Sequence, residues 1–313
     1  MGPYMQDPED LTKDGNRKKH ISVCICTFKR PDLLKRLLHE LENQETEGLF
    51  SYSIVVADND CEQSAKQVAL EIAVRSSIPI SYFVEPQRNI ALTRNKALEN
   101  AQGDFIAFID DDEYPSPNWL CSLLKTCNAS GTTGVLGPVI PYFEQEPPQW
   151  AIKGRFFERP THETGYRIGL SEARTGNVMF RSKVLEGMAS PFRAEFGKGG
   201  EDIDFFARLM DKGCVFVWCN EAAVYEAVPP SRCTRAFLLR REMLRGSLSF
   251  KQRKRRIHNL AKSFLALPVY GLALPILLVV NDLQFMKYLI KFFYHAGRLL
   301  ALLRLDPIRN RDI

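Results

Sequence analysis

Three adjacent carboxylates, Asp110, Asp111 and Asp112, directly follow the apolar run at residues 105–109. Neighbouring carboxylates repel one another and raise each other's pKa unless a cation lies among them. A hard divalent ion, Mg²⁺ or Mn²⁺, suits such a group because it prefers oxygen ligands and keeps open positions for phosphate oxygens of a substrate. The sequence therefore predicts a metal and phosphate site here, with a solvated acidic turn as the alternative.

Other polar side chains stand where a ligand could use them. Glu201 and Asp202 follow two glycines and open an apolar helix, where capping and the helix dipole also favour acids. Asp58 begins an Asp-Asn-Asp run that suits either an Asx turn or a carboxylate accepting from a base N–H. Arg94 lies on a predicted helix, where it belongs either to a solvated face or to a phosphate site.

The elements that position these residues are predicted from the alternation of apolar runs with helical patterns. This alternation is typical of parallel βαβ units and of an α/β fold. Ligands of an open parallel sheet bind beyond the carboxyl ends of the strands, so Thr27, Asp58 and Asp110 are expected to meet in one crevice. The predicted strands are residues 21–26, 53–57, 80–84 and 105–109, and the helices are 31–41, 65–74 and 90–100.

The composition excludes several classes of protein. At 313 residues, with 45% hydrophobic and 25% charged residues, the chain can bury a full core and is neither disordered nor collagen-like. The eight cysteines form no CxxC pair and residues 1–20 show no signal peptide, so we expect a reducing, cytosolic location. Phosphate-loop, GxGxxG and GxSxG motifs are absent, and the five histidines are dispersed, which argues against a histidine-rich zinc site.

The C-terminal region combines positive charge with an apolar segment. Between Arg232 and Lys262 there are eleven Lys or Arg residues and one acid, Glu242, so this block needs an anionic partner. The uncharged segment 264–280 contains two prolines and is shorter than the roughly 20 residues that a membrane span needs. Because basic residues flank it on both sides, we expect a peripheral or re-entrant anchor on an anionic membrane surface and no nucleic-acid binding. A buried helix pair is the alternative.

In chain order, the sequence contains the motifs CTFKRP at 26–31, VADND at 56–60, NIA at 89–91 with RN at 94–95, FIDDDE at 108–113, GGEDIDFF at 199–206 and VP at 228–229. Their order and spacing resemble those of the inverting family 2 glycosyltransferases. Within the family, the chain is similar to the bacterial exopolysaccharide enzymes of the succinoglycan glucosyltransferase type, from about residue 21 to about residue 245. That resemblance implies the GT-A fold, a mostly parallel central sheet with flanking helices.

The resemblance also implies a role for each residue of the crevice. Asp112, together with Asp110, would coordinate Mn²⁺ or Mg²⁺ at the diphosphate of a nucleotide-diphosphate sugar donor. The donor-binding roles fall on Thr27 and Arg30 against the nucleotide, Asp58 at the base, Arg94 on the nucleotide side, Asp110 at the ribose, and Asp111.

Catalysis is implied for the Glu-Asp pair. Asp202 resembles the family's general base, which takes the proton from the acceptor hydroxyl, and Glu201 would orient the acceptor or the loop. One base suffices because the metal, rather than a protein acid, stabilises the leaving diphosphate. Relatives often have histidine where this chain has Tyr225, a poor neutral metal ligand. Arg232 and Arg235, just beyond it, are therefore predicted to bind the diphosphate.

These features predict a tail at residues 1–20, a catalytic domain at 21–230 with nucleotide-binding (21–112) and acceptor (113–230) halves, and a membrane-associated helical region at 231–313. We expect transfer of a hexose, glucose from UDP-glucose, to a lipid-linked oligosaccharide for a bacterial surface polysaccharide, at the cytoplasmic face of the inner membrane. The alternatives are a non-catalytic membrane-bound subunit that binds nucleotide sugar, and an aspartate-nucleophile phosphatase built on Asp110 and Asp112.

Overall fold

A computed structural model describes residues 18–197, 199–250 and 256–305 of the chain. Most of the predicted tail lies outside the described residues, and the first strand begins at Lys19, earlier than expected. The chain divides into two compact units. Unit 1 comprises Met1–Ile140 and Arg159–Glu226, and unit 2 comprises Pro141–Glu158 and Ala227–Ile313.

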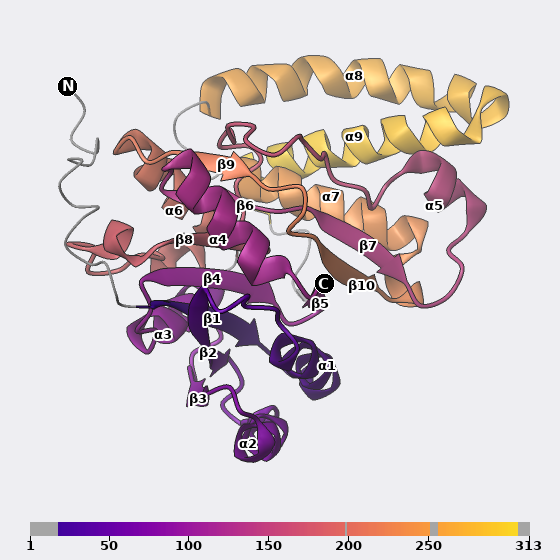
Figure 1. Cartoon of the computed structure of the whole chain (residues 1–313). Helices are drawn as coiled ribbons and strands as arrows, with labels where there is room; N and C mark the ends of the chain where they lie inside the picture. The colour runs from indigo at the N-terminus through magenta and orange to yellow at the C-terminus, as the bar shows by residue number, and fades with distance from the viewer. Residues whose placement is uncertain (1–17, 198, 251–255, 306–313) are drawn as a thin grey trace. The chain divides into compact units, whose positions relative to one another are not determined.

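The core of unit 1 is a seven-stranded sheet in the order β3-β2-β1-β4-β8-β6-β9 (Figure 1). Its first four strands are parallel, as the sequence predicts, and the pairings β4–β8 and β8–β6 are antiparallel. The register places Thr27 beside Asp58 and Cys26 beside Asp110, so these strand ends meet at one edge of the sheet. The strands are β1 (Lys19–Thr27), β2 (Phe50–Asp58), β3 (Ile80–Val84), β4 (Phe105–Asp110), β6 (Gly134–Leu136), β8 (Val178–Arg181) and β9 (Phe216–Trp218).

Both faces of this sheet are buried, which explains why its strands are continuous apolar runs rather than alternating ones. Val23 and Ile25 of β1 face one hydrophobic cluster, and Cys24 between them faces the other. The first cluster contains buried residues of α1 (Pro31–Glu42), α2 (Lys66–Arg75) and α4 (Trp119–Ser130). The second contains buried residues of α3 (Ile90–Glu99) and α6 (Glu201–Asp211).

Local sequence explains where the two helices nearest the site begin. The side chain of Asn89 accepts hydrogen bonds from the backbone N–H groups of Ala91 and Leu92, which caps α3. Gly200 precedes α6 with φ +90°, a left-handed conformation that glycine adopts without strain. Beside the main sheet, β5 (Glu113–Pro115) pairs antiparallel with β10 (Val224–Val228). Short elements are β7 (Val139–Phe143), α5 (Gln149–Gly154) and the 3₁₀ turns Ser182–Leu185, Ala194–Phe196 and Pro230–Arg232.

Unit 2 contains three long helices, α7 (Arg235–Phe250), α8 (Arg256–Val280) and α9 (Asp282–Leu302). Helix α9 packs against both of the others, and a Cβ at Gly297 would overlap the backbone at Met243 of α7. Helix α8 extends well beyond the uncharged segment recognised in the sequence. Its stretch Ile257–Val280 is long and apolar enough to cross a membrane, judged by length and composition alone, and little of that stretch is buried.

Candidate active site

The loop after β1 brings two predicted donor-binding residues to the acidic cluster. The hydroxyl of Thr27 donates to Asp111 Oδ2 at 2.8 Å. Arg30 Nη1 donates to Asp111 Oδ1 at 3.0 Å and to Asp112 Oδ2 at 3.2 Å. Asp111 and Asp112 are both buried. Four residues that the sequence analysis assigned to one crevice are therefore in direct contact.

A buried ion pair connects this cluster to the predicted catalytic helix. Arg94 of α3 donates through Nη1 to Glu201 Oε1 in the first turn of α6. Its Nη2 lies 3.8 Å from Asp110 Oδ1 at the end of β4. The guanidinium also stands over the ring of Phe192, 5.7 Å from its centroid. Arg94 is thus not on a solvated helix face, and it links α3 to the end of β4 and to the start of α6.

Asp202 lies in the first turn of α6 and is half-buried. Its Oδ1 accepts a hydrogen bond from the N–H of Ile203. The N-cap residue is Gly200, which has no side chain to cap the helix. Removal from water raises the pKa of Asp110, and Arg94 lowers it. Smaller effects follow, in which Asp112 raises this pKa, Arg159 lowers it and Asp202 raises it. Asp202 and Asp110 therefore belong to one electrostatic site.

Asp58 is fully buried, and both oxygens of its carboxylate accept hydrogen bonds from other groups of the protein. Oδ1 accepts from the N–H of Asp60, and Oδ2 accepts from the N–H of Ala65 and from the hydroxyl of Tyr82 at 2.7 Å. The Asp60 contact, two residues on, is the Asx turn that the sequence offered as the plainer interpretation. Burial, followed by the hydrogen bond to Asp58, raises the pKa of Tyr82. Reading of a nucleotide base by Asp58 stays a prediction.

Burial shapes the electrostatics of the acidic cluster. Desolvation raises the pKa of Asp111 to about 6, although Arg30 and the hydroxyl of Thr27 act in the opposite direction. Desolvation also raises the pKa of Glu113 well above its usual value, and Asp110 adds to this effect. Glu113 Oε2 accepts from the N–H of Asp110 at 3.2 Å. Glu113 therefore supports the end of β4 through this hydrogen bond.

Sequence reasoning missed several charged neighbours of this cluster. Arg159 ion-pairs with Glu226 at 2.5 Å, and its charge lowers the pKa of both Asp110 and Glu113. Burial lowers the pKa of Arg174 to about 10. Glu113 was available from the sequence as the fourth acid of the run. The two arginines lie in irregular segments where no periodicity marks them.

The remaining predicted positions differ in their surroundings. Tyr225 pairs with Tyr114 in the β5–β10 register, and the two rings stack with centroids 5.5 Å apart. Arg232 and Arg235 belong to unit 2. Arg235 Nη2 ion-pairs with Asp282 Oδ2 at 2.8 Å, so its guanidinium already has an anionic partner there. A diphosphate role for these two arginines is a prediction only.

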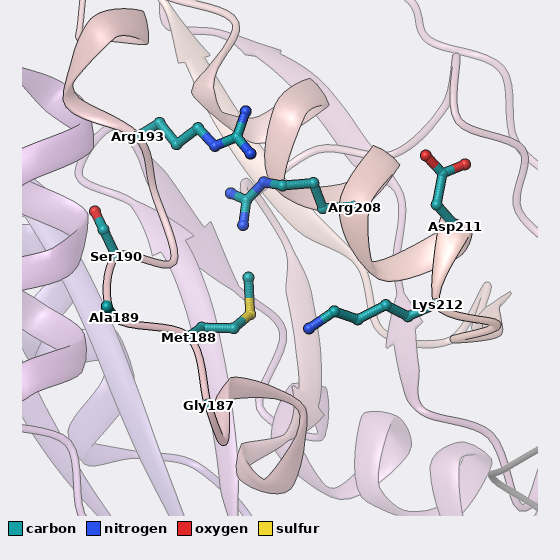
Figure 2. Close-up of a pocket in the computed structure, with 8 residues that line it drawn as sticks. All are labelled: Gly187, Met188, Ala189, Ser190, Arg193, Arg208, Asp211 and Lys212. Carbon is teal, nitrogen blue, oxygen red and sulfur yellow. The ribbon is translucent and has the colours of Figure 1, made fainter.

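A separate hollow of about 350 Å³ lies between the segment 187–193 and the C-terminal half of α6 (Figure 2). Figure 2 shows Arg208 and Lys212 reaching into it from one side and Arg193 from the other. Asp204 already pairs with Arg193 at 3.4 Å and with Arg208 at 2.8 Å. The carboxylates at the strand ends do not line this hollow, which we do not assign to the donor.

The residues of the cluster fit a divalent cation that is shared with a substrate. Among the described residues, no group of three His, Cys, Asp or Glu side chains forms a ready-made metal site. Two carboxylates, those of Asp110 and Asp112, stand at the end of β4. Mg²⁺ and Mn²⁺ commonly bind through one or two carboxylates together with substrate phosphates and water. Asp110 and Asp112 would therefore hold such an ion jointly with a diphosphate.

Comparison with solved structures shows which fold the chain has. The mannosyltransferase PcManGT from Pyrobaculum calidifontis, in complex with GDP-Man and Mn²⁺, superposes with a TM-score of 0.62 at 17% identity, covering 93% of this chain and 88% of that one. Residues 1–349 of TarS from S. aureus, in complex with UDP, superpose with a TM-score of 0.53 at 15% identity, covering 92% and 93%. The expected GT-A glycosyltransferase fold is confirmed.

Sequence comparison then identifies the family. The model for glycosyl transferase family 2 matches residues 22–188, more than half of the chain. The succinoglycan biosynthesis protein ExoM of Rhizobium meliloti (strain 1021) is 33% identical over 253 residues, which cover 80% of each chain. This chain belongs to glycosyl transferase family 2 and is a glycosyltransferase. The phosphatase alternative is wrong.

Proposed function

We propose that this enzyme transfers a hexose, glucose from UDP-glucose, with inversion to a lipid-linked saccharide during synthesis of a bacterial exopolysaccharide. The main observation behind this proposal is that Arg94 contacts both Asp110, in the acidic cluster, and Glu201, in the first turn of α6. The chain also belongs to a family of glycosyltransferases. The similarity to a succinoglycan biosynthesis protein supports the exopolysaccharide as the product. Residues 21–230 would form the catalytic part and residues 231–313 the membrane-associated part.

In this proposal Asp202 acts as the general base. It accepts the proton of the acceptor hydroxyl while that oxygen attacks the anomeric carbon, and the bond from this carbon to the diphosphate breaks on the opposite face. Glu201 is held by Arg94, so the start of α6 is fixed while Asp202 stays half-buried and accessible. A divalent cation held by Asp110 and Asp112 would neutralise the charge that develops on the leaving diphosphate.

Donor turnover tests the proposal. Purified protein is incubated with UDP-, GDP- and dTDP-sugars, a lipid extract as acceptor, and Mn²⁺, Mg²⁺ or EDTA, and release of nucleoside diphosphate is measured. We expect release from UDP-glucose that EDTA abolishes and that Asp202→Asn lowers without loss of UDP binding. UDP binding without release from any donor would instead favour the non-catalytic subunit, and release unaffected by EDTA would refute the metal dependence.

We further propose that unit 2 attaches the enzyme to the cytoplasmic face of an anionic membrane, with α8 lying in the membrane surface. Helix α9 lies between α7 and α8 and is joined to both: Asp282, the first residue of α9, pairs with Arg235 of α7, and Arg298 of α9 donates to the carbonyl of Asn259 near the start of α8. Arg298 also donates to Ser249 of α7 at 3.0 Å. The three helices therefore lie side by side within unit 2.

This arrangement argues against a crossing helix. If α8 spanned the bilayer, α7 would be carried into it with Arg240, Arg241, Glu242 and Arg245, and each charge at the centre costs about 2.5–3.5 kcal/mol on insertion scales. The exposed apolar side chains of α8, such as Leu272 at 78% and Val279 at 87%, can instead enter the interface. The basic block before α8 would contact anionic headgroups.

Labelling of the variant Asn281→Cys in inverted membrane vesicles tests this orientation, because residue 281 follows the end of α8. A membrane-impermeant maleimide should modify the introduced cysteine without detergent, as it should modify the exposed Cys61 of unit 1, which serves as the internal control. Modification of Cys61 together with protection of the introduced cysteine until detergent is added would show that α8 crosses the membrane.

A further inference from the structure

The guanidinium of Arg30 lies among the carboxylates of the acidic cluster, where a cation is favourable. Arg30 Nη1 lies between two carboxylates, 3.0 Å from Asp111 Oδ1 and 3.2 Å from Asp112 Oδ2. Asp111 has a second donor in the hydroxyl of Thr27, so it stays paired whether or not Arg30 moves. Asp112, in contrast, is the residue that the proposed function gives to the metal. The guanidinium and the metal would therefore compete for one carboxylate.

The two arginines of the site differ in their freedom to move. The side chain of Arg94 is 9% exposed and is fixed by a buried partner, whereas that of Arg30 is 34% exposed. Arg30 can leave Asp112 without opening the core. A diphosphate offers the guanidinium a new partner, because arginine binds phosphate oxygens through two parallel hydrogen bonds.

We infer that Arg30 exchanges partners during donor binding: it holds Asp112 in the free enzyme and moves to the donor diphosphate when the metal takes that carboxylate. This inference rests on the proposed metal-dependent function and adds to it that metal and donor bind cooperatively. Metal alone meets a carboxylate already paired with a cation, and donor alone must draw Arg30 away from Asp112. When metal and donor bind together, Asp112 pairs with the metal and Arg30 pairs with the diphosphate. Each ligand therefore promotes binding of the other, by equal factors at equilibrium.

Mn²⁺ binding to the full-length protein, measured by electron paramagnetic resonance with and without UDP, tests the exchange. Arg30→Gln should bind Mn²⁺ about tenfold more tightly than wild type when UDP is absent, because Asp112 has lost its competing cation. The same variant should bind UDP more weakly by calorimetry. Opposite changes in the two affinities are the signature of exchange, since a merely structural role would weaken both.

Lys29→Gln is the matched control. Lys29 is the neighbouring residue, carries the same charge and pairs with Glu62 at 3.5 Å, away from the acidic cluster. It should leave the affinity for Mn²⁺ within about twofold of wild type, since screening weakens the effect of a distant exposed charge. An equal tightening in Lys29→Gln would attribute the effect to net charge and overturn the inference.

Arg30→Lys provides a second variant if circular dichroism shows that Arg30→Gln does not fold. Lysine keeps the charge but lacks the planar fork, so Mn²⁺ affinity without UDP should rise by less than in Arg30→Gln. Unchanged or weaker Mn²⁺ binding in a folded Arg30 variant, with Mn²⁺–UDP binding intact in wild type, would refute the exchange alone. Absence of Mn²⁺ binding to wild type even with UDP would refute the proposed metal dependence and the exchange with it.

Discussion

Replacing Arg94 by alanine should destabilise unit 1 strongly. Its side chain is 9% exposed and that of its partner Glu201 is 6% exposed, so the substitution leaves a buried carboxylate without its cation. Breaking a buried pair in this way costs about 3–5 kcal/mol. Domains are typically stable by about 5–15 kcal/mol, so this loss is a large share of the total. At about 2–4 °C per kcal/mol, it corresponds to a fall in melting temperature of roughly 6–20 °C.

Denaturant unfolding followed by tryptophan fluorescence measures this loss, because Trp119 and Trp218 are both buried in unit 1. Lys96→Ala is the matched control on the same helix, since Lys96 pairs with Glu99 across an exposed surface. That pair should contribute no more than about 1 kcal/mol.

The double substitution Arg94→Met with Glu201→Met distinguishes the loss of the ion pair from the cost of leaving one buried charge without a partner. It removes both charges and keeps much of the volume, so it should be less destabilising than Arg94→Ala. If Arg94→Ala costs no more than Lys96→Ala, or if the double variant is as unstable as the single one, the ion pair does not hold the start of α6 in place.

Four further predictions concern separate parts of the molecule. Asp202→Asn should lower turnover by about 10²–10⁴ with UDP affinity unchanged, measured by UDP release and calorimetry; turnover near wild type would exclude it as the base. Because the folded pKa of Asp111 is about 6 against 3.8 for the unfolded group, the native state binds more protons between these values. Stability of the metal-free protein should therefore fall by up to about 3 kcal/mol as pH rises from 4 to 7, and Asp111→Asn should flatten that slope in melting curves. Leu272→Glu should weaken binding to anionic vesicles about tenfold or more in flotation assays while leaving stability unchanged, since this side chain is 78% exposed; equal binding would place α8 away from lipid. Tyr82→Phe should cost about 1.5–3 kcal/mol in denaturant unfolding because Asp58 loses a donor, and a smaller cost would mean that water replaces the hydroxyl.

The parallel half of the fold could be predicted because each local signal agrees with the tertiary structure. The strands β1 to β4 are buried on both faces, so their apolar runs stand out, and Pro31 and Asn89 mark two of the following helix starts. Parallel strands end at a common edge, so the meeting of Thr27 with the acidic cluster followed from topology alone. This is why the position of Thr27 beside the acidic cluster could be predicted from the sequence.

The charged neighbours of the cluster could not be predicted, because no local sequence signal marks them. Arg159 and Glu226 are 67 residues apart and become partners only through the tertiary fold. Neither lies in a periodic pattern that would fix its direction. For Asp58, the sequence left two interpretations open, and the structure shows how the Asx turn is built without testing the other. Helix α8 was underestimated because the expectation used only the uncharged segment, whereas the helix begins at Arg256.

Three arginines balance the negative charge of the acidic cluster at the strand ends. Arg30, Arg94 and Arg159 come from three separate segments, and each acts on one or more carboxylates of the cluster. Buried carboxylates without cations would be strongly unfavourable, so these arginines stabilise the folded site. In the proposed function, a divalent metal would add two positive charges and a diphosphate would add the negative charges that compensate them. The site is accordingly suited to accept the two ligands jointly. Arg30 and Arg94 both pair directly with aspartates at the end of β4, and Arg30 is the more exposed of the two. Arg30 is therefore the arginine that can move from Asp112 to a diphosphate.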